Sequence, residues 1–152
     1  MAQPIESDVF MAFCTYATIA ILKMMLMAPL TAYFRVTRKA FANPEDTNLG
    51  KTPEEKKKMH RVDEDVERVR RCHLNHLENI VPFVMVGLLY ALTGPNLSSA
   101  LMHFRIFVAS RLVYTVAYIN AMPHPLRGLA WMVGMGVIFS MAFRILTTSL
   151  LL

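Results

Sequence analysis

The chain alternates between long apolar stretches and one strongly polar segment. The first apolar stretch, residues 9–34, is interrupted by a single charge, Lys23. This stretch is longer than the roughly 20 residues that a helix needs to cross the hydrocarbon core of a bilayer. Three further apolar stretches follow the polar segment, at residues 76–93, 98–119 and 127–149. The pattern predicts an all-α fold, an integral membrane four-helix bundle in a single membrane domain that covers residues 1–152.

The polar segment, residues 35–70, is predicted to be the one long loop. Asn43-Pro44 and Lys51-Thr52-Pro53 interrupt helical structure there and leave room for a short helical piece. Helical periodicity resumes near Val66 and runs into the second apolar stretch. The polar first half of that helix is therefore predicted to project beyond the bilayer, and Gly94-Pro95 ends the helix.

Basic residues are distributed unevenly between the two ends of the predicted bundle. The segment from Arg35 to Arg71 holds eleven Lys and Arg residues, whereas Thr93 to Leu97 holds none. Basic loops are retained on the cytoplasmic side of a membrane. The long loop and the turn at residues 120–127 are therefore predicted to be cytoplasmic, and both termini lumenal.

Composition supports a membrane protein and excludes several other classes. Hydrophobic residues make up 55% of the chain and the mean hydropathy is +0.38, above the norm for soluble proteins. The formal net charge of +5 is compatible with nucleic acid binding, but the basic residues between Lys56 and Arg71 alternate with acidic ones, which indicates a solvated loop. No nucleic acid partner is expected.

Two cysteines and a histidine pair leave little room for disulfide or metal chemistry. Cys14 and Cys72 are too few for a disulfide framework, and we expect both to be free thiols. His73 and His76 are three residues apart, but no further ligands accompany them, so no metal is expected.

Candidate chemistry lies on two polar helix faces. Arg71, Asn75 and Glu78 are spaced four and three residues apart and share one stripe of the second predicted helix. The third predicted helix carries a matching stripe, formed by Arg111, Tyr114, Thr115 and Tyr118. Ionisable groups inside a membrane are costly and by default mark a functional interior, so we expect the two faces to meet. For Glu78 and Arg105 a structural ion pair is an equal alternative.

The charge of these faces indicates the kind of ligand. Several cations with amide, phenol and hydroxyl donors suit a small molecule that bears carboxylates. Glutathione has two carboxylates and a thiol, and a nearby cation favours the reactive thiolate. Arg127, at the start of the fourth predicted helix, combines a positive charge with the helix dipole. Apolar electrophiles would reach such a thiolate from the lipid.

Several motifs, in order along nearly the whole chain, resemble those of one known family. They are Phe41 to Asp46, Val66 to Asn75, Leu77 to Phe83, Gly87 to Tyr90, His103 to Val108, Thr115 to Tyr118, and Arg127 to Ala130. The chain resembles the MAPEG family, the membrane-associated proteins in eicosanoid and glutathione metabolism. Within it, the resemblance is strongest to the microsomal glutathione transferases of type one.

The resemblance implies a fold, an activity and a location. It implies a homotrimer of four-helix subunits in the endoplasmic reticulum and outer mitochondrial membranes, with glutathione as co-substrate bound between subunits near the cytoplasmic side. The implied activity is conjugation of the glutathione thiolate to lipophilic electrophiles, with reduction of lipid hydroperoxides as a second reaction.

The resemblance also implies site residues. The positions that match glutathione-binding positions are Arg35, Arg71, His73, Asn75, Glu78, Arg111, Tyr114 and Tyr118. Arg127 matches the residue that stabilises the thiolate, and Asp46 matches an acidic residue with a catalytic part. Three positions depart from the transferase pattern: Thr47 replaces a reactive cysteine, His76 an aspartate, and Tyr114 a histidine.

Other functions remain as alternatives. The sister branch of prostaglandin E synthases also uses glutathione and shares the Asn43 to Asp46 motif. Gly128 stands where that branch has a serine, and Leu74 where it has an arginine, which favours the transferase. A non-enzymatic membrane scaffold would explain four spans but not the arginines on facing helices, and a transporter is disfavoured because no inverted repeat is visible.

Overall fold

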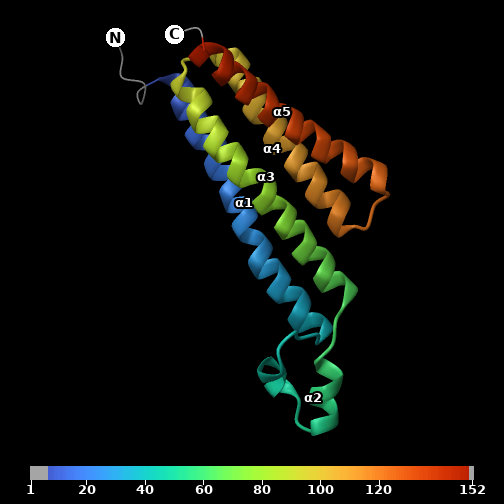
Figure 1. Cartoon of the computed structure of the whole chain (residues 1–152). Helices are drawn as coiled ribbons and strands as arrows, with labels where there is room; N and C mark the ends of the chain where they lie inside the picture. The colour runs from blue at the N-terminus through green and yellow to red at the C-terminus, as the bar shows by residue number, and fades with distance from the viewer. Residues whose placement is uncertain (1–6, 151–152) are drawn as a thin grey trace.

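The computed structural model describes residues 7–150, and the named elements in that range are all helices (Figure 1). They are α1 (Asp8–Arg38), the 3₁₀ helix η2 (Pro44–Leu49), α2 (Pro53–Met59), α3 (Glu64–Leu92), α4 (Leu97–Ile119) and α5 (His124–Leu150). Within the described residues, four helices are long and apolar enough to cross a membrane: α1, α3, α4 and α5. The predicted all-α membrane fold is confirmed. The predicted domain also includes residues 1–6 and 151–152, which lie outside the described residues.

The four long helices form two pairs that pack against each other. α1 packs on α3 and α4, and α5 packs on α3 and α4. α1 and α3 extend beyond the turn that joins α4 to α5, and their far ends carry the segment with α2 (Figure 1). The start of α1 and the end of α5 lie at the opposite end of the bundle. The long loop and the α4–α5 turn therefore point toward the same end, as the distribution of basic residues predicts.

Local capping sets where the helices around the polar segment begin and end. Lys39 ends α1 in the left-handed conformation, with φ of 49°, and its N–H donates to the carbonyls of Arg35 and Val36. Thr52 and Glu55 form a reciprocal capping box at the start of α2. The side chain of Asp63 accepts from two backbone N–H groups at the start of α3. The connection between the long helices is therefore shorter than residues 35–70.

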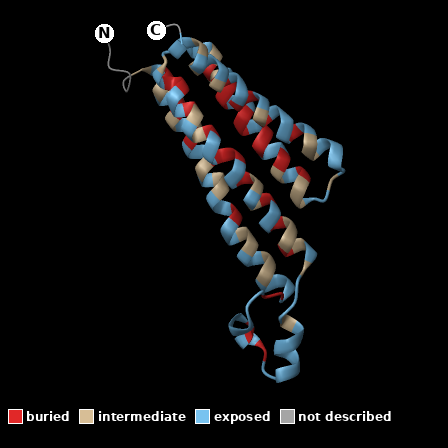
Figure 2. Ribbon diagram, viewed as in Figure 1, coloured by how far each residue is buried: buried red, intermediate tan, exposed pale blue. Residues whose placement is uncertain are grey.

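The core is built from aromatic rings between the helices. The rings of Phe83 and Phe107 stack with centroids 3.8 Å apart. The rings of Phe13 and Phe104 meet edge to face, with centroids 5.8 Å apart. Buried residues recur along the long helices, with many exposed positions between them (Figure 2). Large apolar side chains such as Met85 are exposed on the outer faces, as expected for helices that meet lipid.

Candidate active site

A cavity of about 630 Å³ opens between α3, α4 and α5, near the α4–α5 turn. Its lining residues are Asn75, Tyr114, Tyr118, His124, Arg127, Gly128, Trp131 and Met132. Four of them are among the predicted site residues: Asn75, Tyr114, Tyr118 and Arg127. None of these lining residues is acidic. The positive charge of Arg127 is therefore not offset by a carboxylate within the cavity wall.

Arg127 lies in the first turn of α5 and faces an aromatic ring. Its guanidinium carbon is 4.8 Å from the centre of the Tyr118 ring, a cation–π contact. Its Nε atom is buried and has no hydrogen-bond partner in the part of the chain that the structure describes. The helix dipole places further partial positive charge at this end of α5. Arg127 is thus held in position by Tyr118 and brings an unpaired positive charge to the cavity wall.

Arg111 stands behind the cavity and is fully buried. Its guanidinium donates from Nη1 to Oδ1 of Asn75 at 3.3 Å and from Nη2 to the carbonyl of Ala130 at 2.8 Å. Its carbon also lies 5.1 Å from the centre of the Tyr114 ring. Arg111 therefore ties α4 to α3 and α5, and it orients the amide of Asn75 at the cavity wall.

Gly134 allows α5 to approach Arg111 closely. A Cβ atom built on Gly134 would lie 2.8 Å from Nη2 of Arg111 and 2.9 Å from Oγ of Ser110. Both distances are too short for a non-bonded carbon contact. The absence of a side chain at this position makes room for the buried guanidinium.

The two predicted polar faces meet at one pair of residues, Asn75 and Arg111. The rest of the α3 stripe does not turn inward in a single chain. Arg71 and Glu78 are exposed, and His73 is half-buried. None of these three lines the cavity.

Arg35 and Asp46 lie away from the cavity. Arg35 lines a different hollow of about 480 Å³ beneath the polar segment, with Phe41 and His60 in its wall. Asp46 is exposed in η2, where its Oδ2 accepts from Nδ2 of Asn43 at 3.1 Å. The single chain therefore brings five predicted residues together, Arg111 included, and leaves the others on its surface.

Arg105 has a structural contact with α1. Its Nε donates to the hydroxyl of Tyr16 on α1 at 2.9 Å. No ion pair joins it to Glu78 among the described residues. The alternative of a structural ion pair between Glu78 and an arginine of a neighbouring helix is not found among the described residues.

The sequence did not reveal a buried polar cluster next to Arg111. Nε2 of His76 lies 2.7 Å from Nζ of Lys23, 2.9 Å from Oγ1 of Thr115 and 3.6 Å from Sγ of Cys72. The sequence did offer one signal, because Cys72, His76 and Asn79 recur at helical spacing. In the structure all three residues are buried. The cluster joins α1 to α3 and α4 directly behind the candidate site.

Comparison with known proteins gives the chain a family. The sequence model of the family described as MAPEG family matches residues 13–147 of the chain. The chain belongs to the MAPEG family. The resemblance carried by the motifs is confirmed.

Proteins similar to this chain include microsomal glutathione transferases and prostaglandin E synthases. Microsomal glutathione S-transferase 1 of Sus scrofa is 54% identical over 152 residues, which cover 100% of this chain and 98% of the relative. Microsomal glutathione S-transferase 1 of Homo sapiens is 53% identical over the same shares of both chains. Prostaglandin E synthase of Equus caballus is 41% identical over 134 residues, which cover 88% of this chain and 85% of the relative. The transferase relatives are thus similar along the full length and at higher identity.

Proposed function

We propose that this chain is a membrane-bound glutathione transferase that conjugates the glutathione thiolate to lipophilic electrophiles. Full-length relatives at 53–54% identity bear the name microsomal glutathione S-transferase 1. The cavity between α3, α4 and α5 supplies a site with the charge that an anionic sulfur needs. Conjugation is the reaction that both observations support best.

The observation that carries the proposal is the environment of Arg127. Its buried Nε has no partner within residues 7–150, its guanidinium rests against Tyr118, and the cavity wall holds no carboxylate. A free thiol is only a few per cent thiolate at neutral pH, and an adjacent fixed cation raises that fraction. Arg127 is therefore proposed to stabilise the sulfur anion of bound glutathione.

The proposed reaction needs little machinery beyond this charge. On binding, the glutathione thiol releases its proton to water. The thiolate sulfur then attacks the electrophilic carbon of the second substrate, a carbon–sulfur bond forms, and the leaving group departs with the electron pair of the bond that breaks. Asn75, held by Arg111, is proposed to orient glutathione, because orientation of the reactants accounts for much of the rate gain in such a step.

The wall formed by α5 suits apolar second substrates. Trp131 and Met132 line the cavity and are also exposed on the outer face of the helix. A lipophilic electrophile in the bilayer can therefore approach along this side. Lipid hydroperoxides arrive by the same route, and we propose their reduction as a second reaction: one thiolate attacks the terminal peroxide oxygen, a second glutathione completes the disulfide, and alcohol and water are released.

The predicted residues outside the cavity fit an oligomeric site. We propose that the chain forms a homotrimer in the endoplasmic reticulum and outer mitochondrial membranes, with its termini lumenal. Arg71 and Glu78, exposed on α3, with His73 and Arg35, would then reach glutathione held against a neighbouring subunit. Asp46, in the segment beyond α1, is proposed to act at the same cytoplasmic face.

A second candidate is glutathione-dependent isomerisation of a prostaglandin endoperoxide. A prostaglandin E synthase relative is 41% identical over most of the chain. Gly128 follows Arg127 directly and lines the cavity, so this chain offers no hydroxyl at the position where that branch has a serine. The absence of this donor favours conjugation over isomerisation.

The test is a paired assay on the purified full chain in detergent or nanodiscs. With glutathione and chlorodinitrobenzene, the proposal predicts steady formation of the dinitrophenyl conjugate with release of chloride. With glutathione and a prostaglandin endoperoxide, it predicts no isomerisation above the rate without protein. Isomerisation without conjugation would transfer the assignment to the second candidate, and absence of both activities would overturn the proposal.

A further inference from the structure

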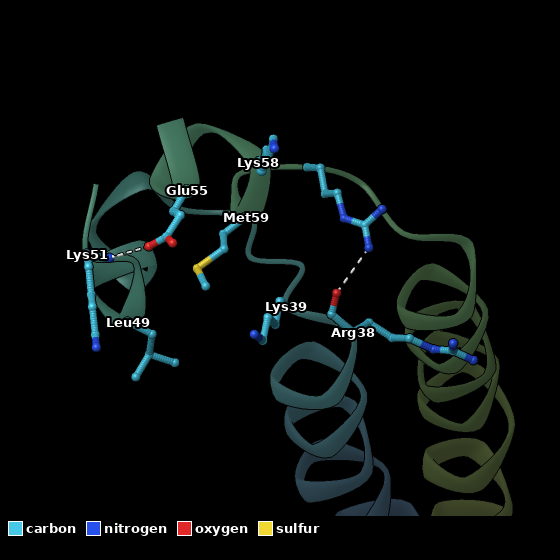
Figure 3. Close-up of a pocket in the computed structure, with 8 residues that line it drawn as sticks. Arg38, Lys39, Leu49, Lys51, Glu55, Lys58 and Met59 are labelled. Carbon is cyan, nitrogen blue, oxygen red and sulfur yellow. Dashed lines mark hydrogen bonds between the residues drawn. The ribbon is translucent and has the colours of Figure 1, made fainter. Parts of the chain in front are cut away.

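Another cavity, open to solvent and about 730 Å³ in volume, lies beyond the end of α1 and is bordered by the segment that carries η2 and α2 (Figure 3). It is remote in sequence from the candidate active site and shares no lining residue with it. Its charged lining consists of five cations and one carboxylate, namely Arg38, Lys39, Lys51, Lys58, Arg61 and Glu55.

Three of these charged residues already have hydrogen-bond or ion-pair partners in the local structure. Arg38 forms an ion pair with Asp65 on α3 at 2.5 Å. Arg61 donates to the backbone carbonyl of Arg38 at 3.0 Å and lies 3.6 Å from a carboxylate oxygen of Asp63. The carboxylate of Glu55 accepts the backbone N–H of Lys51 at 2.8 Å. These contacts hold the cavity walls together.

The side chains of the three lysines have no such partners within residues 7–150. The ammonium groups of Lys39, Lys51 and Lys58 have no hydrogen bond or ion pair within residues 7–150, and all three residues are exposed. They come from three different segments: the end of α1, the stretch before α2, and α2 itself. In Figure 3 they lie at separate places, with Lys51 at the left, Lys58 at the top and Lys39 near the end of α1. Folding thus gathers unpaired positive charge that is interleaved with acidic residues along the sequence.

The cavity lies at the end of a helix that could span a bilayer. α1 is long and apolar enough to span a bilayer, and its last residue, Arg38, already lines the cavity. Just before it, Tyr33 and Val36 are 62% and 57% exposed on the outer face of the helix. Leu49, in the cavity wall itself, is 66% exposed. A ligand with both phosphate groups and acyl chains would therefore contact cations and apolar side chains together at this end of α1.

We infer that this cavity binds the headgroup of a multiply anionic phospholipid, such as a phosphatidylinositol phosphate, from the bilayer that α1 crosses. Clusters of Lys and Arg next to a membrane-spanning helix attract anionic lipid, at about fivefold in affinity for each basic residue. The three unpaired lysines among the lining residues match a headgroup with more than one phosphate. The inference depends on α1 crossing the membrane and not on the proposed transferase activity.

The experiment is native mass spectrometry of the full chain in detergent, titrated with phosphatidylinositol 4-phosphate, with the fraction of lipid-bound protein measured. The test variant combines Lys51→Gln with Lys58→Gln. The matched control combines Lys56→Gln with Lys57→Gln, which removes the same charge from α2 at positions that do not line the cavity. We expect the test variant to bind about 25-fold more weakly, at about fivefold for each lysine, and the control to lose clearly less affinity, because Lys56 and Lys57 do not line the cavity.

Two results would overturn the inference. The first is an equal loss of binding in the test and control variants, which would mean that net charge alone attracts the lipid. The second is competition by soluble inositol 1,4-bisphosphate at an affinity equal to that of the lipid, which would make the ligand a free phosphorylated molecule. Much weaker competition by the soluble headgroup supports the bilayer lipid. Because all four lysines are exposed, unchanged helical circular dichroism is expected in both variants.

Discussion

The guanidinium carbon of Arg127 on α5 lies 4.8 Å from the centre of the Tyr118 ring on α4. Arg127 also borders the cavity and has no ion pair among the described residues, so its positive charge is available to an anionic ligand. The contact also joins the two helices whose turn closes one end of the candidate site. The reactivity of bound glutathione should therefore depend on both residues, in different ways.

Replacing Arg127 should reduce turnover more than it reduces glutathione affinity. Removal of one preorganised group that stabilises a reacting anion costs about a hundredfold in kcat. We expect this loss in Arg127→Ala, with KM for glutathione raised much less, because the cation acts mainly on the reacting sulfur. Steady-state kinetics with chlorodinitrobenzene measure both constants. Arg127→Lys keeps the charge and should retain part of the rate; an unchanged kcat in Arg127→Ala would remove Arg127 from the mechanism.

Two variants of Tyr118 separate its ring from its hydroxyl. Tyr118→Phe keeps the ring beneath Arg127 and should leave kcat near that of the parent, while KM for glutathione rises if the hydroxyl binds the ligand. Tyr118→Leu removes the cation–π contact, worth about 1 kcal/mol, and should lower kcat about fivefold. The same kinetic assay distinguishes them. Equal kcat values in the two variants would show that the ring does not hold Arg127 in its active position.

Arg111 should matter for stability as well as for the site. Arg111→Met removes the donor to Asn75 and to the carbonyl of Ala130. A buried acceptor left without its donor costs about 1–3 kcal/mol, so the midpoint of thermal unfolding in detergent should fall by several degrees. Lys57→Met serves as the control for stability, because Lys57 is exposed in α2 and exposed substitutions change stability by about 0.5 kcal/mol or less. An equal midpoint in both variants would contradict the bracing role of Arg111.

Two glycines in α5 provide a matched pair of substitutions. Gly134→Ala would place a Cβ 2.8 Å from Nη2 of Arg111, and the guanidinium cannot easily move away because it is held on two sides. Overpacking of this kind costs about 1–3 kcal/mol, more than the roughly 1 kcal/mol that alanine gains over glycine in a helix. At Gly136 the Cβ would meet nothing within 4 Å. Thermal unfolding should therefore show a lower midpoint for Gly134→Ala and an equal or higher one for Gly136→Ala; the reverse order would contradict the close approach of α5 to Arg111.

Much of the fold can be predicted because it follows from local patterns. The single charge in residues 9–34 and the periodicity that resumes near Val66 indicate long apolar helices, and the structure has α1 and α3 there. The capping box of Thr52 and Glu55 is also readable from the sequence, although the Asn-Pro and Thr-Pro breakers around it favour a loop. Helix ends in this segment depend on caps more than on periodicity.

The candidate site can be predicted only in part, because it depends on which helix faces meet. Spacing places Arg71, Asn75 and Glu78 on one stripe, but only Asn75 reaches Arg111 within the chain. The contact of Lys23 with His76 joins residues 53 positions apart, and no local pattern reports such a pair. Similarly, mixed charge along the polar segment conceals the basic cavity, which forms only when the end of α1 and α2 come together.

The most direct test of the central claim is the ultraviolet difference spectrum of the purified chain titrated with glutathione at neutral pH. The account predicts a saturable thiolate absorbance band that disappears when chlorodinitrobenzene is added, and that is absent or much smaller in Arg127→Ala. A band of equal size in Arg127→Ala, or no thiolate band in the parent protein at saturating glutathione, would contradict the role of Arg127 as the residue that stabilises the sulfur anion.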